Sequence, residues 1–381
     1  MCATRLRYTP SGSATCGEDG GAYGWVFGVS TTGTGTTIRR MTAPLLTTLA
    51  LAAAVVTGVA VRLLETFCPE GLRDRSTEAK GKPRVGGLAV FLGLCVALPF
   101  EPTAWRIVLP VGLATAVGLY DDVRDSDPVG RLVLLVGVST LAAMLLLLPP
   151  LGALSTDWGV ILLGAAPLPL LFVLTVVGFD FIDGLDGLAA GLALVALLPV
   201  LVIAPSPWIA AGAVATAVYL ATSNRPPART LLGDAGSNGL GLLVALAVVH
   251  PNAGAVTLFA DARADYFGPD PVSLWHSPLM LVGLVAIPLV DVATTFIRRV
   301  RVGDLPSGER GHMHYRLAEL HGSNGLAVLE LVGVGAICAA GGVVGFLMPW
   351  RAWEALAGVL VALSLLVWRT RATRPAPSDS R

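Results

Sequence analysis

The sequence predicts an all-α polytopic membrane protein with about 11 transmembrane helices. Of its 381 residues, 54% are hydrophobic and only 14% are charged, and the mean hydropathy is +0.72. Soluble domains are roughly 25% charged, so this composition excludes an ordinary soluble fold. Apolar runs recur along the chain at roughly the 17–25 residues that a helix needs to cross a bilayer. Basic residues are also sorted between alternate loops, as described below.

The apolar runs define one transmembrane domain over residues 41–368, followed by a short basic cytoplasmic tail at 369–381. Within this domain the spans are expected at approximately 44–61, 85–100, 104–120, 132–149, 158–177, 187–204, 207–222, 239–257, 277–296, 325–348 and 353–368. Residues 1–40 differ, because they are rich in Gly, Thr and Ser and contain no run of that length. We interpret them as a disordered extension or as the result of a start assigned too early, with Met41 as the alternative start.

The basic residues predict the orientation of these spans. Loops that follow odd-numbered spans, and the C-terminal tail, hold nearly all Lys and Arg after Met41, whereas the opposite loops hold only Arg106, Arg263 and Arg351. Cytoplasmic loops carry an excess of Lys and Arg, so the first set of loops and the C-terminus are predicted to be cytoplasmic.

Three carboxylates stand three residues apart at Asp180, Asp183 and Asp186, with apolar runs on both sides. In a helix this spacing would place them along one face. Carboxylates at or within a membrane are costly and usually mark a functional site. The alternative is that they only make a loop polar, and the absence of a basic residue nearby in the sequence argues against it.

Four further polar clusters fall on the same predicted face. They are Lys82–Gly87, Tyr120–Asp125, Leu232–Gly239, and the Arg298-Arg299 pair with Glu309–Arg316. Because the spans were assigned from apolar runs alone, this common side is independent support for one site at the cytoplasmic face.

The residue types in these clusters indicate phosphoryl transfer onto or from a lipid phosphate. Asp121, Asp122, Asp183, Asp186 and Asp234 supply hard oxygen ligands, which Mg²⁺ prefers and usually shares with substrate phosphates. Arg and His side chains can neutralise phosphate oxygens, and glycine-rich turns let backbone N–H groups approach an anion. Each cluster alone has an ordinary structural explanation, such as acids at a helix end or solvated histidines. These explanations would have to hold independently in all five loops on the same face, so one shared site is the simpler interpretation.

The motifs resemble those of the polyprenyl-phosphate N-acetylhexosamine-1-phosphate transferases, which include the lipid I-forming translocase. The resemblance covers about residues 44–330 and rests on Pro83–Gly87, Asp121-Asp122, Asp183–Leu188, Leu232–Ser237, and Arg310, His312, His314 and Arg316-Leu317. It implies transfer of an N-acetylhexosamine-1-phosphate, most closely GlcNAc-1-phosphate, from a UDP-sugar to undecaprenyl or decaprenyl phosphate. UMP would be released, and a cell-envelope glycan such as lipopolysaccharide, teichoic acid or arabinogalactan would be initiated.

The resemblance also implies roles for individual residues. Asp234 would bind Mg²⁺, for which Mn²⁺ could substitute, and Asp122 would lie near the metal. Asp121 and Asp122 would handle the lipid phosphate, and Asp183 and Asp186 would shape the nucleotide site. The expected substrate-binding residues are Lys82, Arg84, Asp180, Arg310, His312, His314 and Arg316. The expected partners are the UDP-sugar, the polyprenyl lipid and the bilayer of a bacterial plasma membrane; a homodimer is left open and no nucleic acid is expected.

Departures from the family pattern leave alternatives open. Val177 and Asp180 stand where asparagines are usual, Tyr315 replaces a common histidine, and Glu309 stands where aspartate is frequent. These changes put the donor sugar in doubt, so a lipid I-type phospho-MurNAc-pentapeptide transferase and a degenerate, non-catalytic member remain alternatives. A transporter would instead predict acids deep within spans and internal repeats.

Overall fold

The computed structural model describes residues 25–32, 35–41, 43–74, 81–124, 126–147, 167–249, 282–302, 312–348 and 351–372. The chain divides into two units, Met1–Ala43 and Pro44–Arg381. The first contains an antiparallel hairpin of β1 (Trp25–Thr32) and β2 (Gly35–Met41), in which Trp25 pairs with Met41 and Thr32 with Gly35. The interpretation of residues 1–40 as a disordered or misassigned extension stays a prediction.

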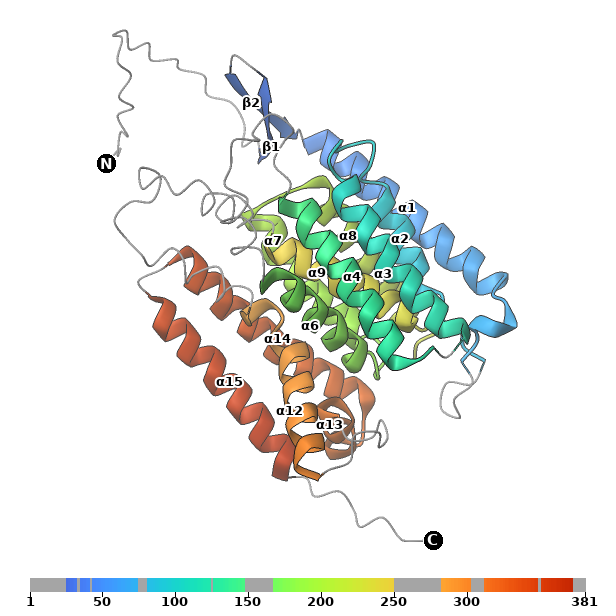
Figure 1. Cartoon of the computed structure of the whole chain (residues 1–381), viewed down its shortest axis with the longest axis vertical. Helices are drawn as coiled ribbons and strands as arrows, with labels where there is room; N and C mark the ends of the chain where they lie inside the picture. Colours follow the sequence, from blue (N-terminus) through green and yellow to red (C-terminus); the bar gives the residue numbers. More distant parts are fainter. Residues whose placement is uncertain are drawn as a thin grey trace. The chain divides into compact units, whose positions relative to one another are not determined.

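The regular secondary structure described for the second unit is helical, as predicted (Figure 1). Its helices are α1 (Ala43–Thr66), α2 (Gly86–Cys95), α3 (Trp105–Arg124), α4 (Pro128–Leu147), α6 (Pro167–Ile182), α7 (Leu188–Ile203), α8 (Pro207–Tyr219), α9 (Gly233–Val249), α12 (Ala286–Val302), α13 (Met313–His321), α14 (Asn324–Leu347) and α15 (Ala352–Ala372). Short 3₁₀ and π turns lie at Glu70–Leu72 and Leu220–Asn224.

Four of the described helices are long and apolar enough to cross a membrane. These candidate spans are Pro44–Thr66, Pro128–Leu146, Asn324–Leu347 and Ala352–Thr370. They expose large apolar side chains, such as Leu51, Val133, Leu329 and Trp353, on their outer faces. Each predicted span overlaps a described helix, and this agrees with a membrane protein. The count of about 11 spans stays a prediction.

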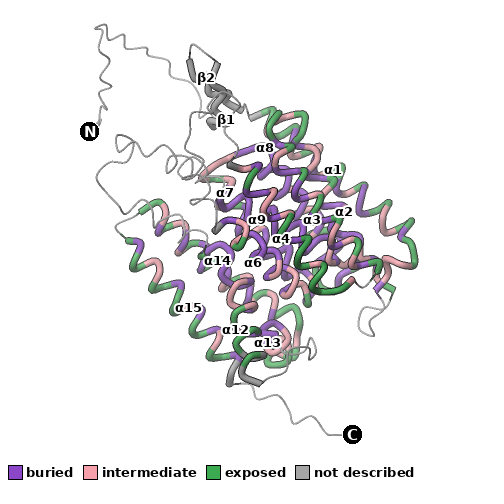
Figure 2. Tube along the Cα trace, in the orientation of Figure 1, coloured by how far each residue is buried: buried purple, intermediate pink, exposed green. Residues whose placement is uncertain are grey.

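Helix α9 forms the core of the second unit. Every residue from Gly233 to Val249 is buried except Asp234, and α9 packs against α2, α3, α4, α6 and α7. Figure 2 shows this helix buried along its length among its neighbours. A helix that is apolar on all sides after its first turns is expected in such a position. Its polar N-terminus is therefore held at a place where several helices end.

Glycines bring α2 and α9 into backbone contact. A Cβ atom on Gly87 would lie 2.2 Å from the Cα atom of Gly236. The backbone N–H groups of Gly86 and Gly87 donate to the carbonyl oxygens of Leu231 and Leu232, both at 3.0 Å. The first glycine motif therefore aligns α2 with the segment that leads into α9.

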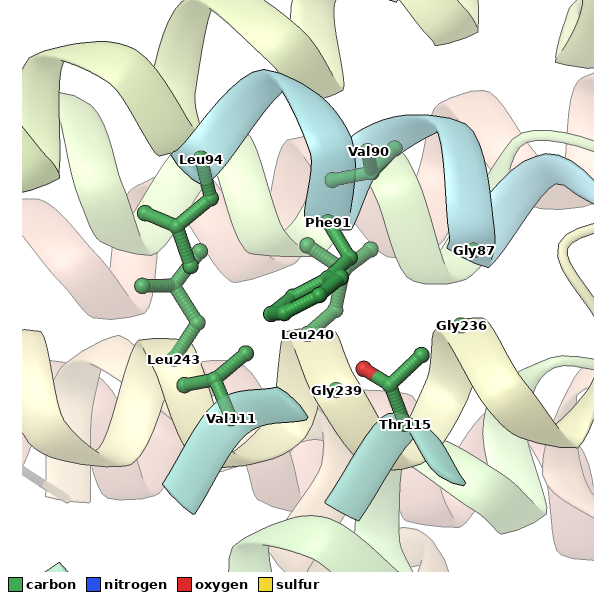
Figure 3. Close-up of a pocket in the computed structure, with 10 residues that line it drawn as sticks. All are labelled: Gly87, Val90, Phe91, Leu94, Val111, Thr115, Gly236, Gly239, Leu240 and Leu243. Carbon is green, nitrogen blue, oxygen red and sulfur yellow. The ribbon is translucent and has the colours of Figure 1, made fainter. Parts of the chain in front are cut away.

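Next to this contact, α2, α3 and α9 line a small apolar pocket (Figure 3). Phe91 of α2 points into it, toward the other two helices. The remaining side chains come from all three helices and are Val90, Leu94, Val111, Thr115, Leu240 and Leu243.

Candidate active site

The central carboxylate stretch spans a helix end. Helix α6 ends at Ile182, and Asp183–Gly187 form a turn in which Gly187 has φ +84°. Glycine adopts this left-handed conformation without the steric cost that other residues meet. Of the three acids only Asp180 lies in the helix, so the condition under which they would share one helix face is not met.

Arg131 brings three carboxylates from three other helices together. Its Nη1 atom donates to Asp121 of α3 and, at 3.0 Å, to Oδ2 of Asp234 at the start of α9. Its Nη2 atom donates to Oδ2 of Asp180 of α6 at 3.1 Å. The other oxygen of Asp180 accepts a hydrogen bond from the Ser237 hydroxyl at 3.0 Å. Four helices thus meet around one guanidinium group.

Arg131 was not predicted as a site residue and was assigned only to a cytoplasmic loop. It stands ten positions from Asp121 and 103 positions from Asp234, so no local pattern links it to these acids. The connection from α3 to α4 is fixed by Ser126, whose backbone N–H donates to Oδ1 of Asp121 at 2.8 Å. Basic partners for the acids therefore exist, but they come from other parts of the chain.

Asp122 caps the N-terminus of α9. Its Oδ1 accepts from the backbone N–H of Asp234 at 3.1 Å, and its Oδ2 accepts from that of Ala235 at 3.0 Å. A carboxylate satisfies orphan N–H groups there and interacts favourably with the helix dipole. These two glycine-motif amides, which were expected to approach a phosphate, therefore already bind the Asp122 carboxylate. The predicted catalytic and metal-binding roles of Asp122 stay untested, and its contacts are those of a cap.

Arg84 and Lys82 connect the first loop to these acids. Arg84 donates to Asp74 through Nε and Nη2, at 3.2 and 3.0 Å, and lies 3.4 Å from Oδ1 of Asp122. Lys82 Nζ lies 3.7 Å from Oδ2 of Asp186, which also accepts from the backbone N–H of Ala228 at 2.8 Å. Both predicted cations therefore lie beside predicted carboxylates.

Asp183 is surrounded by negative charge. Burial, together with the charges of Asp180, Asp122 and Asp186, raises the pKa of Asp183 well above its ordinary value, and Arg84 opposes this shift. A bound cation would relieve the repulsion between these groups.

The histidine loop lies against the same turn. The His312 ring meets Phe181 edge-on, with the ring centroids 5.2 Å apart. A Cβ atom on Gly184 would lie 2.3 Å from Nε2 of His314. Both predicted histidines therefore adjoin the carboxylate stretch. Arg316 is half-buried on α13, and the predicted residue Arg310 lies outside the described residues.

Asp291 is a buried acid of α12 that was not predicted as a site residue either. Its Oδ2 lies 2.8 Å from Nδ1 of His312, and its Oδ1 accepts from the backbone N–H of Met313 at 2.9 Å. It lies within the predicted span 277–296. A single acid in an apolar run forms no motif with its neighbours, so nothing in the sequence indicated its role.

The carboxylates of Asp121, Asp180 and Asp234 fit a divalent cation. They converge on one positive group, and their donor atoms are all oxygens, the ligand type that Mg²⁺ prefers. Among the described residues, Asp291, His312 and His314 also offer potential ligand atoms within 4.8 Å of one another. That set contains imidazole nitrogens, which suit zinc and other transition metals better than Mg²⁺.

His314 is expected to make stability depend on pH. Burial lowers the pKa of His314 to about 4, and neither ring nitrogen has a hydrogen-bond partner among the described residues. Between about pH 6.5 and 4 the unfolded chain binds a proton at this residue that the folded protein does not, so stability decreases as the pH falls through this window. We expect the melting temperature in detergent to fall more between pH 7 and 5 for the wild type than for His314→Gln. An equal fall in both would contradict the assignment.

Known proteins are similar to this chain in sequence. The family model described as glycosyl transferase family 4 matches residues 104–252. The chain is 27% identical to the decaprenyl-phosphate N-acetylglucosaminephosphotransferase of Mycolicibacterium smegmatis, over 93% of this chain and 94% of that protein. It is 26% identical to the probable undecaprenyl-phosphate N-acetylglucosaminyl 1-phosphate transferase of Bacillus subtilis, over 69% and 73% of the two chains.

A more local match is the phospho-N-acetylmuramoyl-pentapeptide-transferase of Deinococcus radiodurans, at 33% identity over 32% of this chain and 33% of that protein. The range matched by the family model includes all six acids from Asp121 to Asp234 described above. The match to glycosyl transferase family 4 and the names of these relatives indicate that the chain is a phosphotransferase enzyme, similar to the polyprenyl-phosphate N-acetylglucosamine phosphotransferases.

Proposed function

We propose that this enzyme transfers GlcNAc-1-phosphate, or a related N-acetylhexosamine-1-phosphate, from a UDP-sugar to a polyprenyl phosphate. The observation that carries the proposal is that the carboxylates of Asp121, Asp180 and Asp234 converge on the guanidinium group of Arg131, where several helices end. The names of the relatives that match most of the chain supply the lipid and sugar classes. The donor nucleotide comes from the resemblance of the motifs.

In the proposed reaction, a phosphate oxygen of the lipid attacks the β-phosphorus of the UDP-sugar. The bond from that phosphorus to the bridging oxygen breaks, and UMP leaves with the bonding electrons. Bound Mg²⁺ would offset the negative charge that develops on the leaving group. Asp234 and Asp121 would hold the metal, and Asp122 would keep the N-terminus of α9 in place for them.

The cations would hold the anionic substrates. Arg131 is suited to a diphosphate, because its planar guanidinium can donate two parallel hydrogen bonds. With a metal bound by the carboxylates, Arg131 would be free to donate hydrogen bonds to phosphate oxygens. Lys82 and Arg84 would assist from the first loop, while Asp183 and Asp186 would shape the nucleotide site.

We further propose that about 11 helices span a bacterial plasma membrane with this site on the cytoplasmic face. The enzyme would then meet its nucleotide substrate in the cytoplasm and its polyprenyl substrate in the bilayer. The apolar outer surfaces of the four candidate spans support the membrane location. A homodimer remains a prediction.

The test is UMP release by detergent-purified protein supplied with polyprenyl phosphate and UDP-GlcNAc. We expect release that depends on lipid and Mg²⁺, and a decrease of at least about 100-fold in Asp234→Asn, since a lost charge stabiliser typically costs that much. Asp127→Asn is the matched control, because Asp127 is an exposed acid directly before α4 whose carboxylate accepts a hydrogen bond from Gly130 N–H at 2.8 Å, and asparagine can accept the same bond. UMP release from UDP-MurNAc-pentapeptide but not from UDP-GlcNAc would favour the lipid I-type reaction. Folded protein that releases no UMP with either donor would contradict the proposal.

A further inference from the structure

Asp291 is fully buried in α12, and both of its oxygens are bound to the start of α13. A buried carboxylate is costly unless it is hydrogen-bonded or paired. One oxygen meets the His312 ring and the other caps the helix by accepting from Met313 N–H. Asp291 therefore joins both the His312 ring and the first backbone N–H of α13 to helix α12.

The same contact defines which ring nitrogen of His312 is available. Nδ1 of His312 lies 2.8 Å from Oδ2 of Asp291 and 3.3 Å from the Thr295 hydroxyl. An ionised carboxylate can only accept hydrogen bonds, so pairing with ionised Asp291 assigns the proton to Nδ1. In a metal-binding or catalytic histidine, such a bond selects the tautomer and orients the other nitrogen. Here that other nitrogen is Nε2.

The ring of His312 is also held from the side of the carboxylate stretch. Phe181, which lies between Asp180 and Asp183 in the sequence, contacts the ring edge-on with a 69° angle between the planes. The ring of His314 stacks on the ring of His312, with 22° between the planes and the centroids 5.5 Å apart. A ring fixed by these three contacts is preorganised for one substrate group.

We propose that Asp291 is a positioning residue for sugar-nucleotide binding and transfer, and that it acts by fixing the tautomer and orientation of His312. His312 Nε2 then contacts the diphosphate or the sugar of the donor. This inference rests on the proposed function for its substrate. The Asp291–His312 pair itself can be tested without turnover.

The first measurement is the state of the His312 ring. The chain contains five histidines, so selective ¹⁵N-histidine labelling gives few signals, and His312→Gln assigns the one of interest. We expect the wild-type ring to be protonated at Nδ1 and Asp291→Asn to change the ring ¹⁵N shifts. An Asp291→Asn protein with unchanged His312 shifts would overturn the inference, whether or not the protein releases UMP.

The second measurement is a double-mutant cycle on UMP release. If Asp291 acts through His312, Asp291→Asn lowers kcat/KM at least about 10-fold in the wild type and less than about 2-fold in the His312→Gln background. A purely structural role gives the same factor in both backgrounds and refutes the inference. Ser323→Ala, which removes the cap of the neighbouring helix α14, is the control for losing a cap and should change only the melting temperature.

His312→Asn covers the case in which Asp291→Asn does not fold. The asparagine amide can replace Nδ1–H as the donor to Asp291 but supplies no equivalent of Nε2. We expect this variant to melt near the wild-type temperature and to lose at least about 10-fold in kcat/KM. Wild-type activity in His312→Asn would overturn the inference. Wild-type protein that releases no UMP, yet shows the Asp291-dependent ring shifts, would instead contradict the proposed function.

Discussion

Replacing Arg131 with methionine is expected to abolish UMP release and to make the folded protein depend on divalent cations. The substitution keeps an unbranched side chain but leaves Asp121, Asp180 and Asp234 without their shared positive charge. Removing one partner from a largely buried ionic group costs about 3–5 kcal/mol, because the remaining charges stay uncompensated. Under the proposed function the variant also lacks the side chain that binds the diphosphate of the donor.

Melting curves in EDTA and in increasing Mg²⁺ test this expectation. The Arg131→Met protein should melt well below the wild type in EDTA, and Mg²⁺ should raise its melting temperature by more than that of the wild type, because the metal replaces the missing cation. Arg124→Met is the control, since Arg124 is an exposed residue at the end of α3 and its loss changes the net charge equally. Full UMP release by Arg131→Met would show that the carboxylates do not need this partner.

Gly118→Ala is expected to displace the start of α9 and to lower both stability and activity. The new Cβ would lie 2.0 Å from the carbonyl oxygen of Asp234 and 2.5 Å from the backbone nitrogen of Ala235. These are backbone atoms, so no side-chain rotation relieves the overlap. Helices α3 and α9 must separate, and the Asp122 cap separates with them. Overpacking of this kind typically costs about 1–3 kcal/mol.

The matched control is Gly137→Ala in α4. Gly137 is an exposed helical glycine, and its Cβ would have no neighbour within 4 Å among the described residues. Alanine there should leave UMP release unchanged and stabilise the helix by up to about 1 kcal/mol. We expect at least a 10-fold loss of kcat/KM in Gly118→Ala alone. Equal behaviour of the two variants would mean that α3 and α9 are not in close backbone contact.

Much of the site could be predicted from sequence because its residues occur in compact motifs. Asp121, Asp180 and Asp234 each adjoin an apolar run, and the common side of their loops indicated that they would meet. The contacts within the site could not be predicted in the same way. The Asp122 carboxylate was expected to serve the substrate, and it binds two N–H groups of α9, a pairing across 112 and 113 residues.

The missed residues share one physical property. Arg131 and Asp291 are single charges whose partners lie on other helices, so neither belongs to a local pattern. Sequence spacing reports which residues share a turn or a face, because that geometry repeats every few residues. It carries no such information about ion pairs formed when distant segments pack.

The sequence by itself determined the helical membrane class and the order of the polar motifs, because length, hydropathy and local spacing are properties of the chain alone. The reaction family was predicted from the resemblance of those motifs to a known family. Only the tertiary structure decided that Arg131 joins three acids, that Asp122 caps α9 and that Asp291 holds His312. The physical reason is that each of these charges is paired by the packing of helices that lie far apart in the sequence: α3, α4 and α6 around the polar end of α9, and α12 against the start of α13.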